Sequence, residues 1–187
     1  MTLDQAMIEH CSPTLVGLKP ASLFRLQPED GAGFVRDFLA LREPFAGLGL
    51  RLTILRGCRR TGAYLVYLYR ERALEELLGR REYREFLASV GYAPGAGLRD
   101  CLRRLASRIC LSGEFPHEIG VFLGYPLEDV KGFIAHKGRN YTCCGCWKCY
   151  GDPRAAMRRF ADYRRCTEAF RRRFAAGTPV IQMVTAA

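Results

Sequence analysis

Hydrophobic residues recur at helical spacing over several parts of the chain. Phe34, Phe38 and Leu41 predict a helix over about residues 30–42, because they return to one helix face every three or four positions. A second apolar face, over about residues 98–109, is formed by Leu98, Cys101, Leu102, Leu105 and Ile109. Similar patterns indicate helices over about residues 4–11, 71–78, 81–90, 116–123, 126–137 and 153–174. We expect the first of these to end before Pro13, because proline disfavours a helical conformation in the preceding residue.

Other runs have the pattern of β-strands. Residues 50–56 alternate, and residues 63–69 are rich in Tyr, Val and Leu; a short segment bounded by glycines joins them, which predicts a β-hairpin. Residues 141–150 and 178–184 are also predicted to be strands, and residues 14–26 to be extended or irregular. The sequence therefore predicts an α+β fold: a single globular domain over residues 1–187, with a small, mostly antiparallel sheet that includes a hairpin at about residues 50–69 and is covered by several helices.

Composition narrows the class of protein. The 187 residues are 49% hydrophobic and 26% charged, which is typical of a globular domain. No apolar run approaches the roughly 18 residues that cross a membrane, and the first ten residues lack the pattern of a signal peptide. We therefore expect no membrane partner and a cytoplasmic location, where the nine cysteines are thiols, metal ligands or catalytic groups rather than structural disulfides.

The net charge of +10 permits nucleic acid or acidic small molecules as partners. Residues 119–130 have the spacing of a helix-turn-helix motif, which raises the hypothesis of a non-enzymatic binding or regulatory module. However, the second helix begins with Leu127, Glu128 and Asp129, and carboxylates repel phosphates. Nucleic acid is therefore disfavoured, and the same pattern also arises where two short helices meet at a glycine corner.

Residues 115–150 concentrate the chemically active side chains. They contain two of the three histidines, four of the nine cysteines and the only tryptophan. Together with Cys11, they suggest a small thiol-dependent enzyme in which Cys11 is the nucleophile, His117 the base and Glu118 the partner of His117, provided that the fold brings them together. The side chains proposed to hold an acidic substrate are His10, Lys19, Trp147, Lys148 and Tyr150. The simpler interpretation of Cys11 is a buried small hydrophobe.

A cysteine cluster provides the alternative. Cys143, Cys146 and Cys149 form two overlapping C-x-x-C spacings, which suit zinc or an iron–sulfur cluster if a fourth ligand is available. A single C-x-x-C can also be a redox pair. On one continuous strand, neighbouring members of this set would face opposite sides, so a turn is needed to bring them together.

Three blocks of sequence carry a resemblance to a known family. They are His10–Leu15 with Lys19-Pro20 and Leu23-Phe24; Phe115–Gly120 with Phe122–Pro126, Asp129-Val130 and Gly132-Phe133; and Gly145, Trp147-Lys148 and Tyr150. In these blocks the chain resembles the bacterial family catalogued as domain of unknown function 3793. The resemblance implies no activity or cofactor. It also implies that Cys144 stands where the family often has a cysteine, whereas Cys143, Cys146 and Cys149 are additions, which argues against a metal cluster common to the family.

Overall fold

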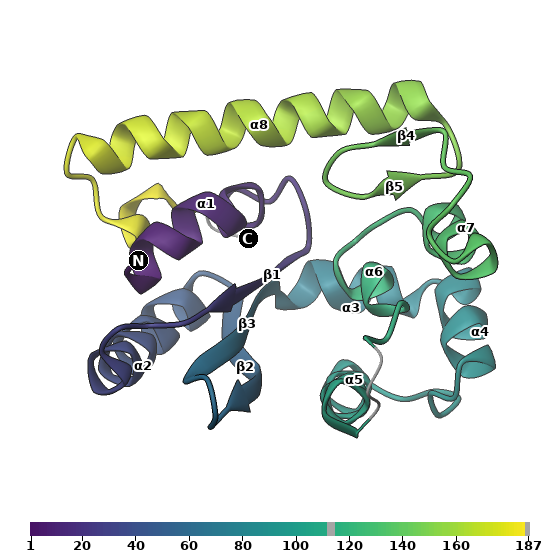
Figure 1. The fold of residues 1–187 in the computed structure, drawn as a ribbon, viewed down its shortest axis with the longest axis horizontal. Coiled ribbons are helices and arrows are strands. Elements are labelled where there is room, and N and C mark those ends of the chain that lie inside the picture. The colour runs from purple at the N-terminus through teal and green to yellow at the C-terminus, as the bar shows by residue number, and fades with distance from the viewer. Residues whose placement is uncertain (112–114, 186–187) are drawn as a thin grey trace. The chain divides into compact units, whose positions relative to one another are not determined.

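The computed structural model describes residues 1–111 and 115–185, apart from the side chains of residues 110 and 111. The chain divides into two compact units. The first, here called the sheet unit, comprises Met1–Ala73 and Arg165–Ala187, and the second, the helical unit, comprises Leu74–Arg164. The boundaries fall within helices α3 (Glu71–Gly79) and α8 (Pro153–Ala175) (Figure 1). The α+β class is confirmed, while the organisation as a single domain stays a prediction.

The sheet unit is built on three antiparallel strands. They are β1 (Ala21–Leu26), β2 (Leu50–Cys58) and β3 (Ala63–Arg70), in the order β1-β3-β2. The predicted hairpin is confirmed as β2–β3, with a bulge between Ile54 and Arg56. Residues 21–26, for which the sequence left the choice between extended and irregular structure open, form the third strand, in which Ala21 pairs with Tyr69 and Leu26 with Tyr64.

Two helices cover the strands of the sheet unit. Helix α1 (Leu3–Leu15) contacts β1 and helix α2 (Gly31–Gly47) contacts β2 (Figure 1). The prediction that the first helix ends before Pro13 is wrong, since α1 continues to Leu15. The guanidinium of Arg70, 55 residues away in sequence, donates to the carbonyl oxygens of Thr14 and Leu15, each at 2.7 Å. These bonds satisfy carbonyl groups that a helix end leaves without partners.

The C-terminal segment of the sheet unit differs from the prediction. Residues 178–184 were expected to form a strand, but Val180–Met183 form a 3-10 helix, η1. Val180 and Met183 are buried in the core of the unit, and Thr185 donates its backbone N–H to the carbonyl of Leu15. Helical spacing places these two side chains, three positions apart, on one face, whereas a strand would turn them to opposite faces.

The helical unit consists of short helices and a small hairpin. It contains parts of α3 and α8. It also contains all of α4 (Arg81–Ser89), α5 (Leu98–Leu111), α6 (Ile119–Phe122) and α7 (Leu127–His136). The predicted strand over residues 141–150 is instead a hairpin of β4 (Cys143–Cys144) and β5 (Lys148–Cys149). The chain reverses at Gly145, where a Cβ atom would lie 2.3 Å from the ring of Phe160. Glycine therefore lets the turn pack directly on α8.

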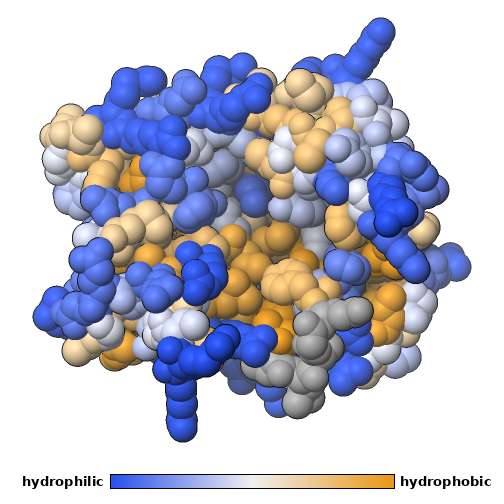
Figure 2. All heavy atoms as spheres, in the orientation of Figure 1, coloured by the Kyte–Doolittle hydropathy of each residue, from blue (hydrophilic) through white to orange (hydrophobic). Residues whose placement is uncertain are grey.

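The surface along α8 is strongly polar. Figure 2 shows hydrophilic side chains projecting from the edge along which this helix runs. Helix α8 carries the exposed arginines Arg154, Arg158, Arg159, Arg164 and Arg165. Among the helices of the described residues, none combines the length and apolar character that crossing a membrane requires.

Candidate functional site

Helices α6 and α7 of the helical unit meet at a tight corner. Gly120 faces α7 so closely that a Cβ atom would lie 2.8 Å from a methyl carbon of Val130. Gly124 takes a φ of +75° between the two helices, a conformation that favours glycine. The glycines that give the helix-turn-helix spacing thus let α6 and α7 pack closely. Helix α7 in turn contacts β5 of the hairpin.

Asp129 on α7 fixes the hairpin to the helix. Its buried carboxylate accepts a hydrogen bond from the Trp147 indole N–H at 2.7 Å. The other carboxylate oxygen accepts the backbone N–H groups of Tyr150 at 2.6 Å and of Gly151 at 2.9 Å. Hydrogen bonds to an ionised acceptor are stronger than neutral ones, so Asp129 sets the position of both the tryptophan and the end of β5.

Trp147 and Lys148 are held by further contacts. The indole stacks on Tyr125, with ring centroids 5.0 Å apart, and meets Phe160 edge-on at 4.5 Å. The ammonium group of Lys148 donates to the carbonyl of Gly138 at 2.8 Å and lies 5.0 Å from the ring centroid of Tyr141. Both side chains are therefore fixed before any ligand arrives.

These elements enclose a pocket of about 260 Å³, here called the hairpin pocket. Its apolar walls are Ile119, Tyr125, Val130, Phe133 and Trp147. His117, Cys144 and Lys148 supply the polar side chains, together with Asp129. Three residues predicted from the sequence, His117, Trp147 and Lys148, thus line one cavity.

His117 lies at the exposed border of the hairpin pocket. Its ring is 5.0 Å from that of Phe133, on α7. Tyr150, also predicted to contact substrate, is not among the lining residues. Its ring stacks on His136 with centroids 5.6 Å apart, and it packs against Gly132, where a Cβ atom would lie 2.4 Å from the Tyr150 ring.

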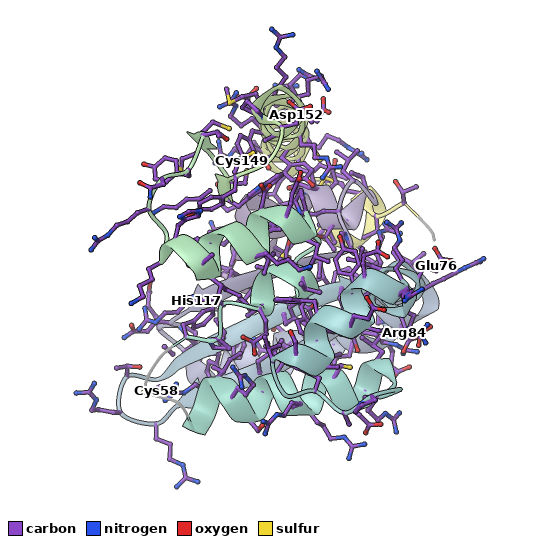
Figure 3. The ribbon with its side chains drawn as sticks, turned by 90° about the vertical axis from the view of Figure 1, so that its right-hand side faces the viewer. Cys58, Glu76, Arg84, His117, Cys149 and Asp152 are labelled. Atoms are coloured by element: carbon purple, nitrogen blue, oxygen red, sulfur yellow. The ribbon has the colours of Figure 1, made fainter. Side chains whose placement is uncertain are left out.

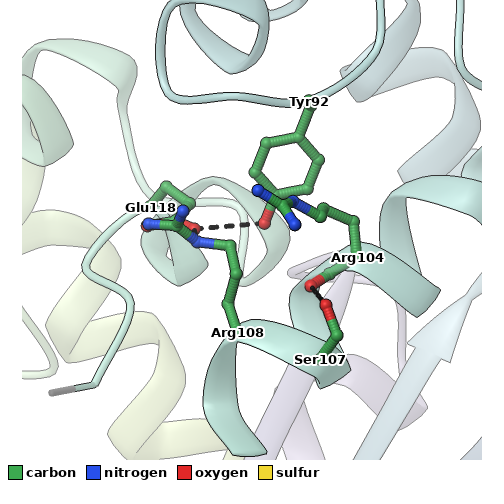
Figure 4. A network of polar contacts seen from close by, with 5 residues as sticks. All are labelled: Tyr92, Arg104, Ser107, Arg108 and Glu118. Carbon is green, nitrogen blue, oxygen red and sulfur yellow. Dashed lines mark hydrogen bonds and ion pairs between the residues drawn. The ribbon is translucent and has the colours of Figure 1, made fainter. Parts of the chain in front are cut away.

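Glu118 is occupied by partners other than the adjacent His117. Its carboxylate lies 2.5 Å from Arg108 Nε of α5 and accepts a hydrogen bond from the Tyr92 hydroxyl at 3.2 Å (Figure 4). Burial, with the nearby Glu118 charge, raises the pKa of Tyr92 well above its ordinary value. The buried network explains Glu118 as a group that joins α5 to the start of α6.

Cys11 lies in the sheet unit, whereas His117 lies in the helical unit. The thiol is fully buried in the core, and burial raises its pKa to about 12, although Lys19 and a hydrogen bond with Ser22 act in the opposite direction. Desolvation is the largest of these effects on the Cys11 thiol. Such a thiol is protonated at neutral pH, which favours the simpler interpretation of a buried hydrophobe.

The sheet unit also contains His10, whose ring stacks on Phe24 at 5.5 Å. Burial lowers the pKa of His10, while the neighbouring Glu9 raises it. The groups that shift the pKa of the Cys11 thiol are Lys19 and Ser22 rather than His10, which agrees with adjacent residues pointing to different sides of a helix.

The proposed metal ligands are not gathered around one point. Cys143 and Cys149 pair across the hairpin, while Cys146 lies exposed in its turn. Within residues 1–111 and 115–185, no three His, Cys, Asp or Glu side chains are grouped so that they can hold a metal ion. The hairpin therefore supplies two opposed thiols rather than the three convergent ones that the spacing suggested.

Two of the polar side chains that line the hairpin pocket were missed as site residues. Asp129 was noticed only within the block Asp129-Val130 and as a carboxylate that would repel phosphates, and Cys144 only as a position where the family often has a cysteine. The turn at Gly145 brings Cys144 opposite Lys148. The sequence shows an aspartate 18 residues before the lone tryptophan, but the residues around Asp129 do not reveal that it is buried or that it binds the Trp147 indole.

Thiol reactivity distinguishes Cys11 from a cysteine at the tip of β2–β3. A hydrogen bond with the Thr61 side chain, helped by backbone N–H groups, lowers the pKa of Cys58 to about 7. We therefore expect limiting iodoacetamide at pH 7.5 to alkylate Cys58 well before Cys11, with a rate that rises through pH 7 as the thiolate forms. Peptide mass spectrometry measures both, and Cys58→Ser is the control. Faster labelling of Cys11 would restore it as the reactive thiol.

Comparison with known proteins identifies the family to which the chain belongs. The profile of a family described as protein of unknown function, DUF3793, matches residues 7–184, so the chain belongs to this family. The resemblance found in the sequence blocks is confirmed. No curated protein and no solved structure matches the chain.

Proposed function

We propose that the helical unit binds a small organic acid in the hairpin pocket. The observation that supports this proposal is the gathering of an apolar cavity, a fixed lysine and a histidine at one place. A volume of about 260 Å³ is slightly below the range for pockets that bind drug-sized ligands, roughly 300–1,000 Å³, so the ligand must be small. It suits a ligand with one ring or a short branched chain and a single carboxylate.

Lys148 is the group that selects an acid. An ammonium has three N–H donors, and the contact with Gly138 uses one of them. That contact and the Tyr141 ring hold the ammonium in place, so little side-chain freedom is lost when a ligand binds. Tyr125 and Trp147, which stack on each other, offer apolar faces to the body of the ligand.

The only tryptophan, Trp147, makes the proposal directly measurable. Titration with small aromatic and branched aliphatic carboxylates, such as benzoate and isovalerate, is expected to change its fluorescence, whereas the corresponding amides give a much weaker response. Lys148→Met is expected to weaken binding of the acid roughly 10- to 100-fold, the loss of one hydrogen bond between charged groups. The affinity for the amide should change little.

Lys131→Met is the matched control. Lys131 is also a lysine of the helical unit, but it is exposed on α7 and does not line the pocket. The variant removes the same charge and should leave acid binding unchanged. Equal losses in both variants would show that binding follows overall charge, and binding of amides as strong as that of acids would refute the role given to Lys148.

A second candidate function follows from Cys144, which lines the same pocket as His117. The thiol-dependent enzyme predicted with Cys11 is better served by Cys144, because Cys144 is exposed. In an acyl transfer, the Cys144 sulfur bonds to the carbonyl carbon, the bond to the leaving group breaks, and His117 takes the thiol proton and returns it to the leaving group. With p-nitrophenyl acetate as the probe, Cys144→Ser and His117→Ala should both abolish release of p-nitrophenol above background, whereas Cys146→Ser should not.

A further inference from the structure

The β4–β5 hairpin places two thiols opposite each other. In its antiparallel ladder, Cys143 pairs with Cys149 and Cys144 pairs with Lys148. Directly opposed residues of antiparallel strands have Cβ atoms about 4.5–5.5 Å apart. A disulfide needs about 3.5–4.5 Å between Cβ atoms, so a small closure of this short ladder is enough. Cys146 lies in the exposed turn between the two strands.

The two thiols differ in access. Cys149 is only 1% exposed, next to Trp147, Ala156 and Phe160, whereas Cys143 is partly exposed near the start of α8. Figure 3 shows Cys149 in the hairpin beside that start, where Asp152 is labelled. Burial raises the pKa of the Cys149 thiol to about 11, and the nearby Asp129 and Cys143 act in the same direction. Cys143 and Cys149 are directly opposed in the antiparallel ladder, and such residues point to the same face of a sheet. The side chains therefore already face each other in the reduced state.

We propose that Cys143 and Cys149 form a reversible disulfide by exchange with a small-molecule disulfide such as oxidised glutathione. The Cys143 thiolate attacks one sulfur of the reagent, forming a mixed disulfide and releasing one small thiol. The Cys149 thiolate then attacks the Cys143 sulfur, and the second small thiol leaves with the proton that Cys149 gives up. The protein loses two protons and two electrons, which reduce the reagent to two thiols.

The bond would act on the wall of the hairpin pocket. Cys144, Trp147 and Lys148 all lie between the two linked positions, and all three line the pocket. A disulfide across this short loop fixes β4 against β5 and so changes how much the wall can adapt to a ligand. The disulfide itself is independent of the proposed function, whereas its effect on ligand affinity rests on it.

The test equilibrates the full-length protein with mixtures of reduced and oxidised glutathione, followed by acid quenching, thiol blocking and mass spectrometry. Trypsin cleaves after Arg139, Lys148 and Arg154, so the disulfide is expected to join the peptide of residues 140–148 to that of residues 149–154. Fragmentation assigns the bond to Cys143. The joined peptides should persist in Cys144→Ser and Cys146→Ser and disappear in Cys143→Ser and Cys149→Ala.

The oxidised protein should also unfold at a temperature roughly 5–10 °C higher, because a crosslink restricts the unfolded chain. Cys143→Ser removes the partly exposed thiol and keeps the buried one, so loss of the bond in this variant cannot be attributed to a disrupted core. A bond from Cys146 to Cys149, or only mixed disulfides with glutathione at every ratio, would overturn the proposal. A Cys143–Cys149 bond with unchanged benzoate affinity would keep the disulfide and remove its control of the pocket.

Discussion

Replacing Asp129 with alanine is expected to lower the free energy of unfolding of the helical unit by about 4 kcal/mol. The substitution removes the acceptor of three hydrogen bonds, from the Trp147 indole and from the backbone N–H groups of Tyr150 and Gly151. Each buried donor left without a partner costs about 1–3 kcal/mol. Urea denaturation followed by the fluorescence of Trp147 measures the effect where it arises, because this tryptophan belongs to the same unit.

Asp129→Asn separates the loss of hydrogen bonds from the loss of side-chain volume. Asparagine keeps one carbonyl oxygen as an acceptor, but its NH₂ group must face one of the three donors, so we expect about half the destabilisation of the alanine variant. Glu82→Ala, which removes an exposed carboxylate from α4, should cost less than about 1 kcal/mol. Similar losses in Asp129→Ala and Glu82→Ala would contradict the role of Asp129 in holding the hairpin.

The elements predicted correctly are those whose pattern is local. Alternation and glycine spacing are enough for the β2–β3 hairpin, and helical periodicity is enough for α5. The errors occur where distant residues decide the structure. Arg70 supports the end of α1 beyond Pro13. In the same way, the turn at Gly145 packs on Phe160. The prediction of a single strand over residues 141–150 used only the local pattern and therefore missed this contact.

In the candidate site, too, local features could be predicted and contacts between distant residues could not. His117, Trp147 and Lys148 were found from the sequence, because unusual residue types in one short region mark them. Their convergence depends on the α6–α7 corner and on the chain reversal in the β4–β5 hairpin, which also brings in Cys144. The pairing of Cys11 with His117 could be stated only as a condition, since the sequence shows neither the burial of Cys11 nor the unit to which each residue belongs.

For the ion pair of Glu118 and Arg108, the loss of stability in the double variant is expected to be smaller than the sum of the losses in the two single variants. Glu118 is 3% exposed and Arg108 33% exposed. Arg108→Met leaves a buried carboxylate without its cation and is expected to cost about 3–4 kcal/mol. Glu118→Met leaves a charge that can still reach water, so we expect a smaller loss of about 2–3 kcal/mol. The double variant should lose less than Arg108→Met alone, because two apolar side chains need no charge partner.

Urea denaturation of the four proteins, followed by Trp147 fluorescence, gives the coupling between the two residues as a double-mutant cycle, which we expect to be at least about 2 kcal/mol. Tyr92→Phe is the control for the remaining hydrogen bond, and it should cost about 1 kcal/mol by removing the hydroxyl that donates to Glu118. A double variant whose loss equals the sum of the single losses would mean that Arg108 and Glu118 act independently. Glu118 would then again be available as the partner of His117, since its burial would no longer be explained by a bond to α5.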